Sequence, residues 1–118
     1  MGRKVTGPQD INVRRLIREL ENTKIKIWRV IADTLKKARR KRVEANIGRI
    51  NRVTKDGDVI VVPGKVLGAG NLERKITIGA LTWSEKAEKI VNDAGSSLIT
   101  LDKMIEKYPN GSNVRIIK

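Results

Sequence analysis

The distribution of hydrophobic and polar positions predicts short helices and strands that alternate along the chain. The strongest signal lies at residues 59–62, where four β-branched residues follow one another with no polar position between them. A strand with one solvated face alternates between apolar and polar residues, so this stretch predicts a strand covered on both faces. Pro63 has no backbone N–H to donate to a neighbouring strand, and it therefore predicts the end of this one.

Two helices are predicted before this strand. The first covers about 13–23, with Asn12 as its N-cap. Its apolar stripe, at the spacing of a helix, is formed by Val13, Leu16, Ile17 and Leu20. The second covers about 26–40, and its inward side is predicted to be Ile27, Ile31, Leu35 and Ala38.

Shorter elements follow from residue 44 onwards. The predicted strands are 45–47, 76–81, 97–100 and 114–117. A helix-like turn from Gly48 is predicted to point Ile47, Ile50 and Val53 inward. A helix over about 85–94 is predicted with Ser84 as its N-cap, or with Thr82 and Glu85 as a capping box, and with Gly95 after its last turn. A short helix is predicted from Leu101 to Tyr108. Alternating strands and helices predict an α/β fold, although the order of the strands does not follow from the sequence.

The chain has 118 residues, enough for one domain with a modest core. We expect residues 1–10 to be a basic, flexible tail and residues 11–118 to be a single domain, helical over 11–43 and strand-rich over 44–118. No apolar run approaches the ~18 residues of a membrane span, and no signal peptide opens the chain. These features predict a cytoplasmic protein without membrane contact.

The composition also limits the chemistry. The chain contains no Cys and no His, so it lacks thiolate nucleophiles, the usual zinc ligands and the commonest general base. We therefore predict a protein that is not an enzyme and needs no metal, cofactor or small-molecule substrate.

Charge distribution points to a polyanionic partner. The formal net charge is +13. Residues 1–53 carry 16 Lys/Arg against 5 Asp/Glu, net +11, whereas residues 54–118 carry 10 against 8, net +2. Six of the seven residues from Lys36 to Arg42 are basic, with no acidic residue among them, and repulsion within this run would be relieved by surrounding phosphates. Nucleic acid is the leading candidate partner.

A glycine-rich turn follows the central strand, with Gly64, Gly68 and Gly70 around one lysine. It fails as a Walker A loop, because Val66 stands where the magnesium-binding hydroxyl is needed. It fails as a dinucleotide fingerprint, because Glu73 holds the position of the third glycine. A structural turn and a turn that brings the backbone close to phosphate both remain open.

The same turn carries a resemblance to a known family. The stretch Val62-Pro63-Gly64-Lys65-Val66-Leu67-Gly68-Ala69-Gly70, with Ile76-Thr77-Ile78 and Trp83-Ser84-Glu85-Lys86-Ala87, resembles the archaeal and eukaryotic large-subunit ribosomal protein eighteen-e. Residues 45–100 are more loosely similar to the C-terminal half of bacterial ribosomal protein fifteen. The resemblance implies a structural component of the large subunit that binds ribosomal RNA. It also implies a basic helical N-terminal part followed by an irregular superhelix of β-β-α turns.

Partners and site residues follow from charge and resemblance together. We expect ribosomal RNA and neighbouring large-subunit proteins as partners, without an obligate homo-oligomer. Trp28 and Trp83 occupy apolar positions, so recognition of folded RNA through phosphates and 2′-OH groups is favoured over stacking of single-stranded bases. The residues predicted to contact RNA are Arg3, Lys4, Arg14, Arg15, Arg18, Lys36, Lys37, Arg39, Arg40, Lys41, Arg42, Arg49, Arg52, Lys65, Gly68, Gly70, Arg74 and Lys75.

Two other classes of function were weighed. A free nucleic-acid-binding regulator or RNA chaperone fits the charge, but the basic helix lacks Asn or Gln beside its arginines for reading bases. A nucleotide-dependent enzyme would need the phosphate-binding motifs that the glycine turn fails to match.

Overall fold

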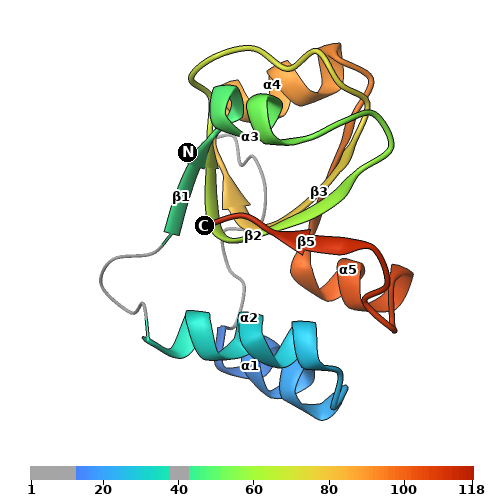
Figure 1. Cartoon of the computed structure of the whole chain (residues 1–118). Helices are drawn as coiled ribbons and strands as arrows, with labels where there is room; N and C mark the ends of the chain where they lie inside the picture. The colour runs from blue at the N-terminus through green and yellow to red at the C-terminus, as the bar shows by residue number, and fades with distance from the viewer. Residues whose placement is uncertain (1–12, 38–42) are drawn as a thin grey trace.

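The computed structural model describes residues 13–37 and 43–118, and in them the chain forms one parallel β-sheet with helices on both faces (Figure 1). The predicted α/β class is confirmed. The strands are β1 (Val43–Asn46), β2 (Val59–Leu67), β3 (Thr77–Trp83), β4 (Ser97–Thr100) and β5 (Val114–Ile116). The helices are α1 (Val13–Asn22), α2 (Lys26–Lys37), α3 (Ile47–Val53), α4 (Glu85–Asp93) and α5 (Leu101–Lys107).

Strands β1 to β4 lie side by side in the order in which they occur along the chain, and every pairing is parallel. The fifth strand, β5, pairs with the first part of β2, at Val59 to Val61. Strand β1 pairs with the last part, at Gly64 to Leu67. Because β3 occupies the opposite edge of β2, β1 and β5 share one edge of this central strand.

The prediction that Pro63 ends the central strand is wrong. Strand β2 continues through Pro63 to Leu67, and its pairing with β3 shifts register between Val62 and Lys65. Proline is tolerated where a strand bulges, because the ladder is interrupted there and no N–H is required. Because the register shift lies at Pro63, the missing N–H of this proline costs no hydrogen bond to β3, and the strand can continue.

Two further predictions need correction. In α2 the buried side is formed by Trp28, Ile31, Ala32 and Leu35, whereas Ile27 is only half-buried and Ala38 lies outside the described residues. In α3, Ile47 and Ile50 are buried as predicted, but Val53 is 42% exposed. Val53 is the last residue of the helix, and the buried face of the helix ends before it.

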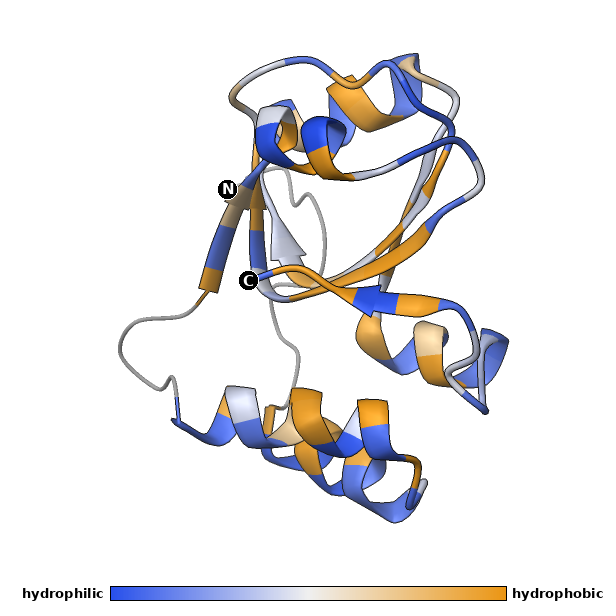
Figure 2. Ribbon diagram, in the orientation of Figure 1, coloured by the Kyte–Doolittle hydropathy of each residue, from blue (hydrophilic) through white to orange (hydrophobic). Residues whose placement is uncertain are grey.

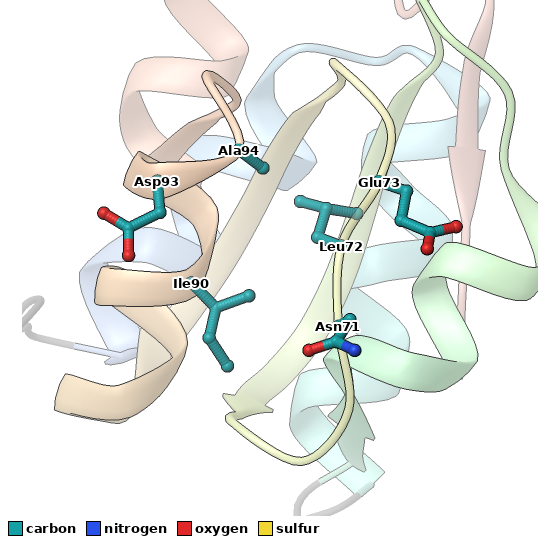
Figure 3. Close-up of a pocket in the computed structure, with 6 residues that line it drawn as sticks. All are labelled: Asn71, Leu72, Glu73, Ile90, Asp93 and Ala94. Atoms are coloured by element: carbon teal, nitrogen blue, oxygen red, sulfur yellow. The ribbon is translucent and has the colours of Figure 1, made fainter.

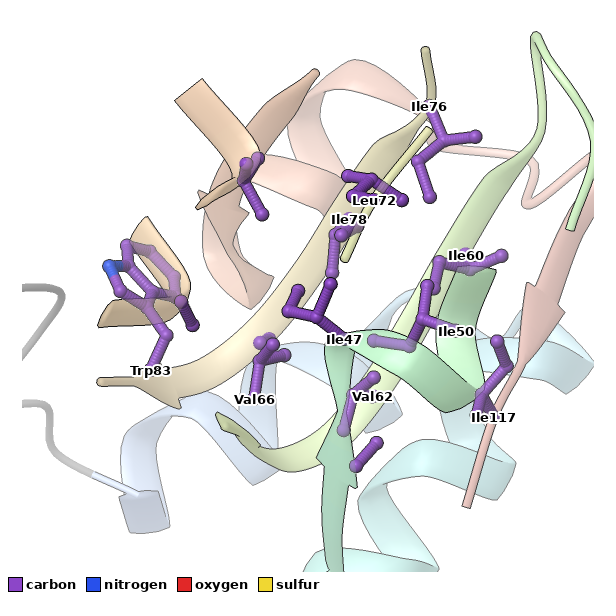
Figure 4. Packing of buried hydrophobic residues seen from close by; sticks show 14 residues of the cluster. Ile47, Ile50, Ile60, Val62, Val66, Leu72, Ile76, Ile78, Trp83 and Ile117 are labelled. Carbon is purple, nitrogen blue, oxygen red and sulfur yellow. The ribbon is translucent and has the colours of Figure 1, made fainter. Parts of the chain in front are cut away.

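Apolar residues on the two faces of the sheet form two cores (Figure 2). Ile60 and Val62 point into the core under α3 and α4, which Figure 4 shows from close by. Val61 points into the other core, together with residues of α1, α2 and α5 such as Leu20 and Met104. The prediction that this strand is covered on both faces is therefore confirmed.

The predicted limits of α4 are also confirmed. The Ser84 side chain accepts a hydrogen bond of 3.1 Å from the backbone N–H of Ala87, which satisfies a donor of the first turn. Gly95 follows the C-cap with φ of 78°, the left-handed conformation that ends many helices.

Candidate nucleic-acid interface

Helices α1 and α2 pack against each other as a hairpin on one side of the sheet (Figure 1), and hydrophilic positions are prominent on the outer side of this hairpin (Figure 2). Leu16 and Leu20 bury one side of α1, which leaves Arg14 and Arg18 exposed one turn apart. Arg29 is exposed on α2. Among residues 13–37 and 43–118, none of these three arginines forms an ion pair with a carboxylate. Their guanidinium groups are therefore available to an external anion.

Two other predicted contacts on the hairpin already have acidic partners. The Arg15 Nε lies 3.3 Å from a carboxylate oxygen of Glu19, four residues later on the same helix. The Lys36 ammonium pairs with Glu21, which joins the ends of the two helices. The hydrogen bond that this ammonium donates to the Glu21 carboxylate, and then the negative charge of Glu21, raise the pKa of Lys36 above its usual 10.5. Both pairs are largely solvent-exposed, so a phosphate can compete for the cations.

Helix α3 adds a second exposed pair of cations. Ile47 and Ile50 fix its orientation by packing into the core, and Arg49 and Arg52 are exposed on the outer side. Neither arginine has an ion-pair partner in the described part of the chain. Residues three apart on a helix lie on the same face, so the two charges can reach neighbouring phosphates.

Arg74, another predicted contact, is held by the protein itself. Its Nε donates a 2.8 Å hydrogen bond to the carbonyl oxygen of Thr54, just after α3. Its side chain is only one-third exposed, and its ion pair with Glu73 is long, at 4.0 Å. Arg115 behaves in the same way: it donates to the Val53 carbonyl at 2.7 Å and pairs with Asp58 at 3.3 Å. Both arginines thus secure the segment that leads from α3 into β2.

The predicted lysine contacts of the strand-rich part are exposed. Lys65 lies on β2 in register with Glu44 of β1, so a negative charge lies on the adjacent strand. Lys75 is exposed, and its backbone N–H donates to Asp56 at 2.8 Å, which fixes the loop but leaves the ammonium group free for solvent. Lys37 is exposed at the end of α2.

The structure supplies an intramolecular reason for the glycines at 68 and 70. A Cβ on Gly68 would lie 2.8 Å from the backbone nitrogen of Ala87, in the first turn of α4. Gly70 has φ of 100°, and a Cβ there would lie 2.5 Å from the Cα of Gly48 in α3. The Gly48 N–H also donates a 2.8 Å hydrogen bond to the Ala69 carbonyl. The turn therefore packs between the N-terminal ends of two helices; its contact with RNA stays a prediction.

Other predicted contacts fall on residues that the structure does not describe, namely Arg3, Lys4, Arg39, Arg40, Lys41 and Arg42. Conversely, the hairpin exposes three cations that the sequence analysis did not select: Lys24, Lys26 and Arg29. Lys26 and Arg29 lie off the apolar stripe of α2, the same criterion that selected the arginines of α1. If every basic residue off an apolar stripe had been selected, Lys26 and Arg29 would have been predicted as contacts too.

The two tryptophan side chains offer no stacking platform. Trp28 is fully buried and Trp83 is 8% exposed. The Trp83 indole N–H donates to Glu88 at 3.3 Å, which holds the ring against α4. Recognition by base stacking needs exposed rings, so this arrangement agrees with the preference for folded RNA.

No cluster of three or more His, Cys, Asp or Glu that could hold a metal occurs in the described residues, and no helix among them is long and apolar enough to cross a membrane. What the described chain offers is a rigid α/β scaffold with solvent-facing arginines on α1, α2 and α3. These features are typical of one class, the basic proteins that bind nucleic acid through its phosphates.

Comparison with known proteins identifies a single family within this class. Residues 10–118 match the family described as "Ribosomal protein 60S L18 and 50S L18e". The chain is 45% identical over 116 residues to large ribosomal subunit protein eL18 of Pyrobaculum aerophilum, with 95% of each chain covered. It is 42% identical over 113 residues to the eL18 protein of Sulfurisphaera tokodaii, covering 96% of each chain. The eL18 protein of Methanococcus maripaludis is 37% identical over 105 residues, or 89% of this chain and 88% of the relative.

The chain belongs to this ribosomal protein family. The resemblance stated from the glycine turn is thereby confirmed, and so is the expectation of a structural, non-enzymatic ribosomal protein.

Proposed function

We propose that the protein binds and stabilises folded RNA of the large ribosomal subunit, chiefly through phosphate contacts made by residues 1–53. The single observation that carries this proposal is the distribution of available arginines. In the described residues, the arginines without an ion-pair partner are Arg14, Arg18, Arg29, Arg49 and Arg52, all in the first part of the chain. Guanidinium groups suit phosphate because they can donate two hydrogen bonds in one plane.

The remaining predicted contacts extend this surface. In the sequence, the run Lys36 to Arg42 begins at the end of α2 and ends immediately before β1. Arg3 and Lys4 would add charge from the tail, and Lys65 and Lys75 would add single contacts beside the glycine turn. We also propose that the backbone at Gly68 and Gly70 approaches RNA closely. Packing against α4 and α3 already explains why these two residues are glycines, but residues 69–70 are exposed, so RNA can reach the turn.

The fold suits a scaffold for RNA. Four parallel strands follow one another in chain order, and α3 and α4 connect two of the successive pairs. This order supports the irregular superhelical path that the family resemblance implies. Neighbouring large-subunit proteins are the expected protein partners.

The test is the salt dependence of rRNA affinity for Arg49→Gln/Arg52→Gln. Both side chains are exposed and have no described ion pair, so folding should be retained. Loss of two phosphate contacts should make the slope of log K against log salt shallower by about 1.4 to 1.8 units.

The matched control is Lys103→Gln/Lys107→Gln, which removes two exposed cations from α5. Its slope should stay within about half a unit of the parent. Equal slopes for the two double variants would contradict the proposed interface. Loss of the parent protein from purified large subunits at moderate salt would contradict the ribosomal role itself.

A further inference from the structure

Helix α3 carries two of the proposed phosphate contacts, Arg49 and Arg52, but it has only 7 residues. A helix shorter than about 12 residues is marginally stable on its own in water, so tertiary contacts must hold α3 in shape. Ile47 and Ile50 anchor its inner side in the core. The position of the two outer arginines therefore depends on what holds the ends of this helix.

The first turns of α3 are held by the segment that follows the glycine turn. The Gly48 N–H donates a 2.8 Å hydrogen bond to the Ala69 carbonyl, and the Asn51 side-chain oxygen accepts a 2.9 Å bond from the Glu73 N–H. Figure 3 shows this segment between α4 and α3, where it also lines a pocket with α4. Because the segment contributes backbone groups to both bonds, no charged side chain is needed at this end of the helix.

The C-terminal end of α3 is held by an arginine of the last strand. The Arg115 Nη2 donates a 2.7 Å hydrogen bond to the carbonyl of Val53, the last residue of α3. Carbonyls in the last turn of a helix have no partner within it, and the helix dipole favours a cation there. Arg115 supplies both the donor and the positive charge, from 62 residues further along the chain.

Asp58 fixes the guanidinium group of Arg115. The Asp58 Oδ2 lies 3.3 Å from Arg115 Nη1 and also accepts a 2.9 Å hydrogen bond from the Lys55 N–H. The Asp58 side chain is 24% exposed, so one partner of the ion pair is largely held away from solvent. Arg115 itself lies on β5, in register with Ile60 of the central strand. Its side chain thus connects the end of α3 to the sheet.

Arg74 strengthens the same end of the helix. Its Nε donates a 2.8 Å hydrogen bond to the carbonyl of Thr54, the residue that follows α3. The buried Thr54 hydroxyl donates a 2.7 Å bond to the Ile50 carbonyl, within the last turn. Two arginines from later segments therefore bind the consecutive carbonyls of Val53 and Thr54.

We propose that Arg115, with its partner Asp58, is a positioning residue for RNA binding: it fixes the end of α3 so that Arg49 and Arg52 are in place before RNA binds. Arg115 acts through α3 and makes no phosphate contact of its own. The physical basis is that cations already held in place lose less conformational freedom on binding. This inference rests on the proposed function, because α3 is part of the proposed RNA surface.

The first test is Arg115→Lys, which keeps the charge but replaces a planar group that reaches two acceptors by a single ammonium group. Affinity for purified large-subunit rRNA is measured at fixed salt, on protein whose folding has been checked by circular dichroism. We expect the affinity to fall by about two- to tenfold, because the arginines of α3 must then be ordered on binding.

The second test, Asp58→Asn, reverses the sign that electrostatics alone would give. Loss of a negative charge should by itself strengthen the binding of a polyanion. If Asp58 acts by holding Arg115, Asp58→Asn should instead weaken rRNA binding, by about twofold or more. The matched control is Asp93→Asn, which removes an exposed carboxylate from the end of α4 and should not weaken binding.

A double-mutant cycle separates positioning from direct contact. In Arg49→Gln/Arg52→Gln, the side chains that Arg115 positions are already gone, so adding Arg115→Lys should change the affinity by less than about twofold. A direct contact of Arg115 with phosphate predicts the same loss in both backgrounds. If Arg115→Lys does not fold, Asp58→Asn provides the same comparison.

Parental affinity in Arg115→Lys, stronger binding in Asp58→Asn, or equal losses in the two backgrounds of the cycle would each overturn the proposal. Failure of the proposed function gives a different result. In that case Arg49→Gln/Arg52→Gln binds rRNA as the parent does, so α3 is not part of the RNA surface and there is nothing for Arg115 to position.

Discussion

In residues 13–53, the guanidinium groups of α1, α2 and α3 mostly face solvent, whereas both arginines of residues 54–118 bind backbone carbonyls of the protein. Formal charge gives +11 for residues 1–53 and +2 for residues 54–118. The structure makes the contrast sharper, because Arg74 and Arg115 hold the chain together and only lysines remain available around them. A count of charges therefore understates how unevenly the solvent-facing arginines are distributed.

The two regions meet where the glycine turn packs against α3. A Cβ at Gly70 (φ 100°) would lie 2.5 Å from Gly48, while a Cβ at Gly57 (φ 90°) would meet nothing within 4 Å. Gly57→Ala should therefore cost backbone strain of about 1 kcal/mol or more. Gly70→Ala should cost about 1 to 3 kcal/mol beyond that, because the turn must move away from α3.

Urea unfolding of the two variants measures this difference. Equal destabilisation would show that the close approach of Gly70 and Gly48 does not hold the two regions together. The rRNA affinity of folded Gly70→Ala, compared with that of Lys65→Gln, separately tests whether the turn also touches RNA.

Identical substitutions in the two regions should have different costs. Arg74→Gln removes the 2.8 Å bond to the Thr54 carbonyl and should lower the free energy of unfolding by about 1 kcal/mol, allowing for its partial exposure. Arg52→Gln, at an exposed site on α3, should change stability by less than about 0.5 kcal/mol and weaken rRNA binding instead. Chemical denaturation of both variants checks this, and the reverse ranking would remove the distinction between the two kinds of arginine.

The smallest effect concerns Lys36, whose cation is paired although it lies in the basic region. Its pKa is raised because Glu21 stabilises the charged form through a hydrogen bond and through its charge. The contribution of this pair to stability is thus complete below the ordinary lysine pKa and is lost as the pH rises through the higher folded value. An NMR titration of the Lys36 Cε should show the raised pKa, and Glu21→Gln should return it toward 10.5. No change in Glu21→Gln would mean that the two side chains do not interact in solution.

Local signals explain which elements were predicted correctly. Helix α4 was predicted within one residue, because Ser84 and Gly95 act on their immediate neighbours. The buried character of β2 followed from its uninterrupted β-branched run. The continuation of β2 beyond Pro63 depends instead on its register with β1 and β3, which the sequence does not reveal.

The site was predictable only in part, for the same reason. Exposed cations on α1 and α3 follow from their apolar stripes, and the Arg15–Glu19 pair follows from its spacing of four residues. The internal role of Arg74 depends on a carbonyl 20 residues away, and that of Arg115 on Asp58, 57 residues away. Such long-range contacts depend on the tertiary fold, so the local sequence pattern around each arginine does not predict them.

The most direct test of the unequal distribution compares two sets of four cations. One chain carries Gln in place of Arg39, Arg40, Lys41 and Arg42; the other carries Gln in place of the exposed lysines Lys86, Lys89, Lys103 and Lys107. Both lose four positive charges, so any effect of net charge alone is the same. The first should show a slope of log K against log salt shallower by roughly three units, and the second should stay within about one unit of the parent. Equal slopes in the two chains would contradict the claim that RNA is bound chiefly by residues 1–53.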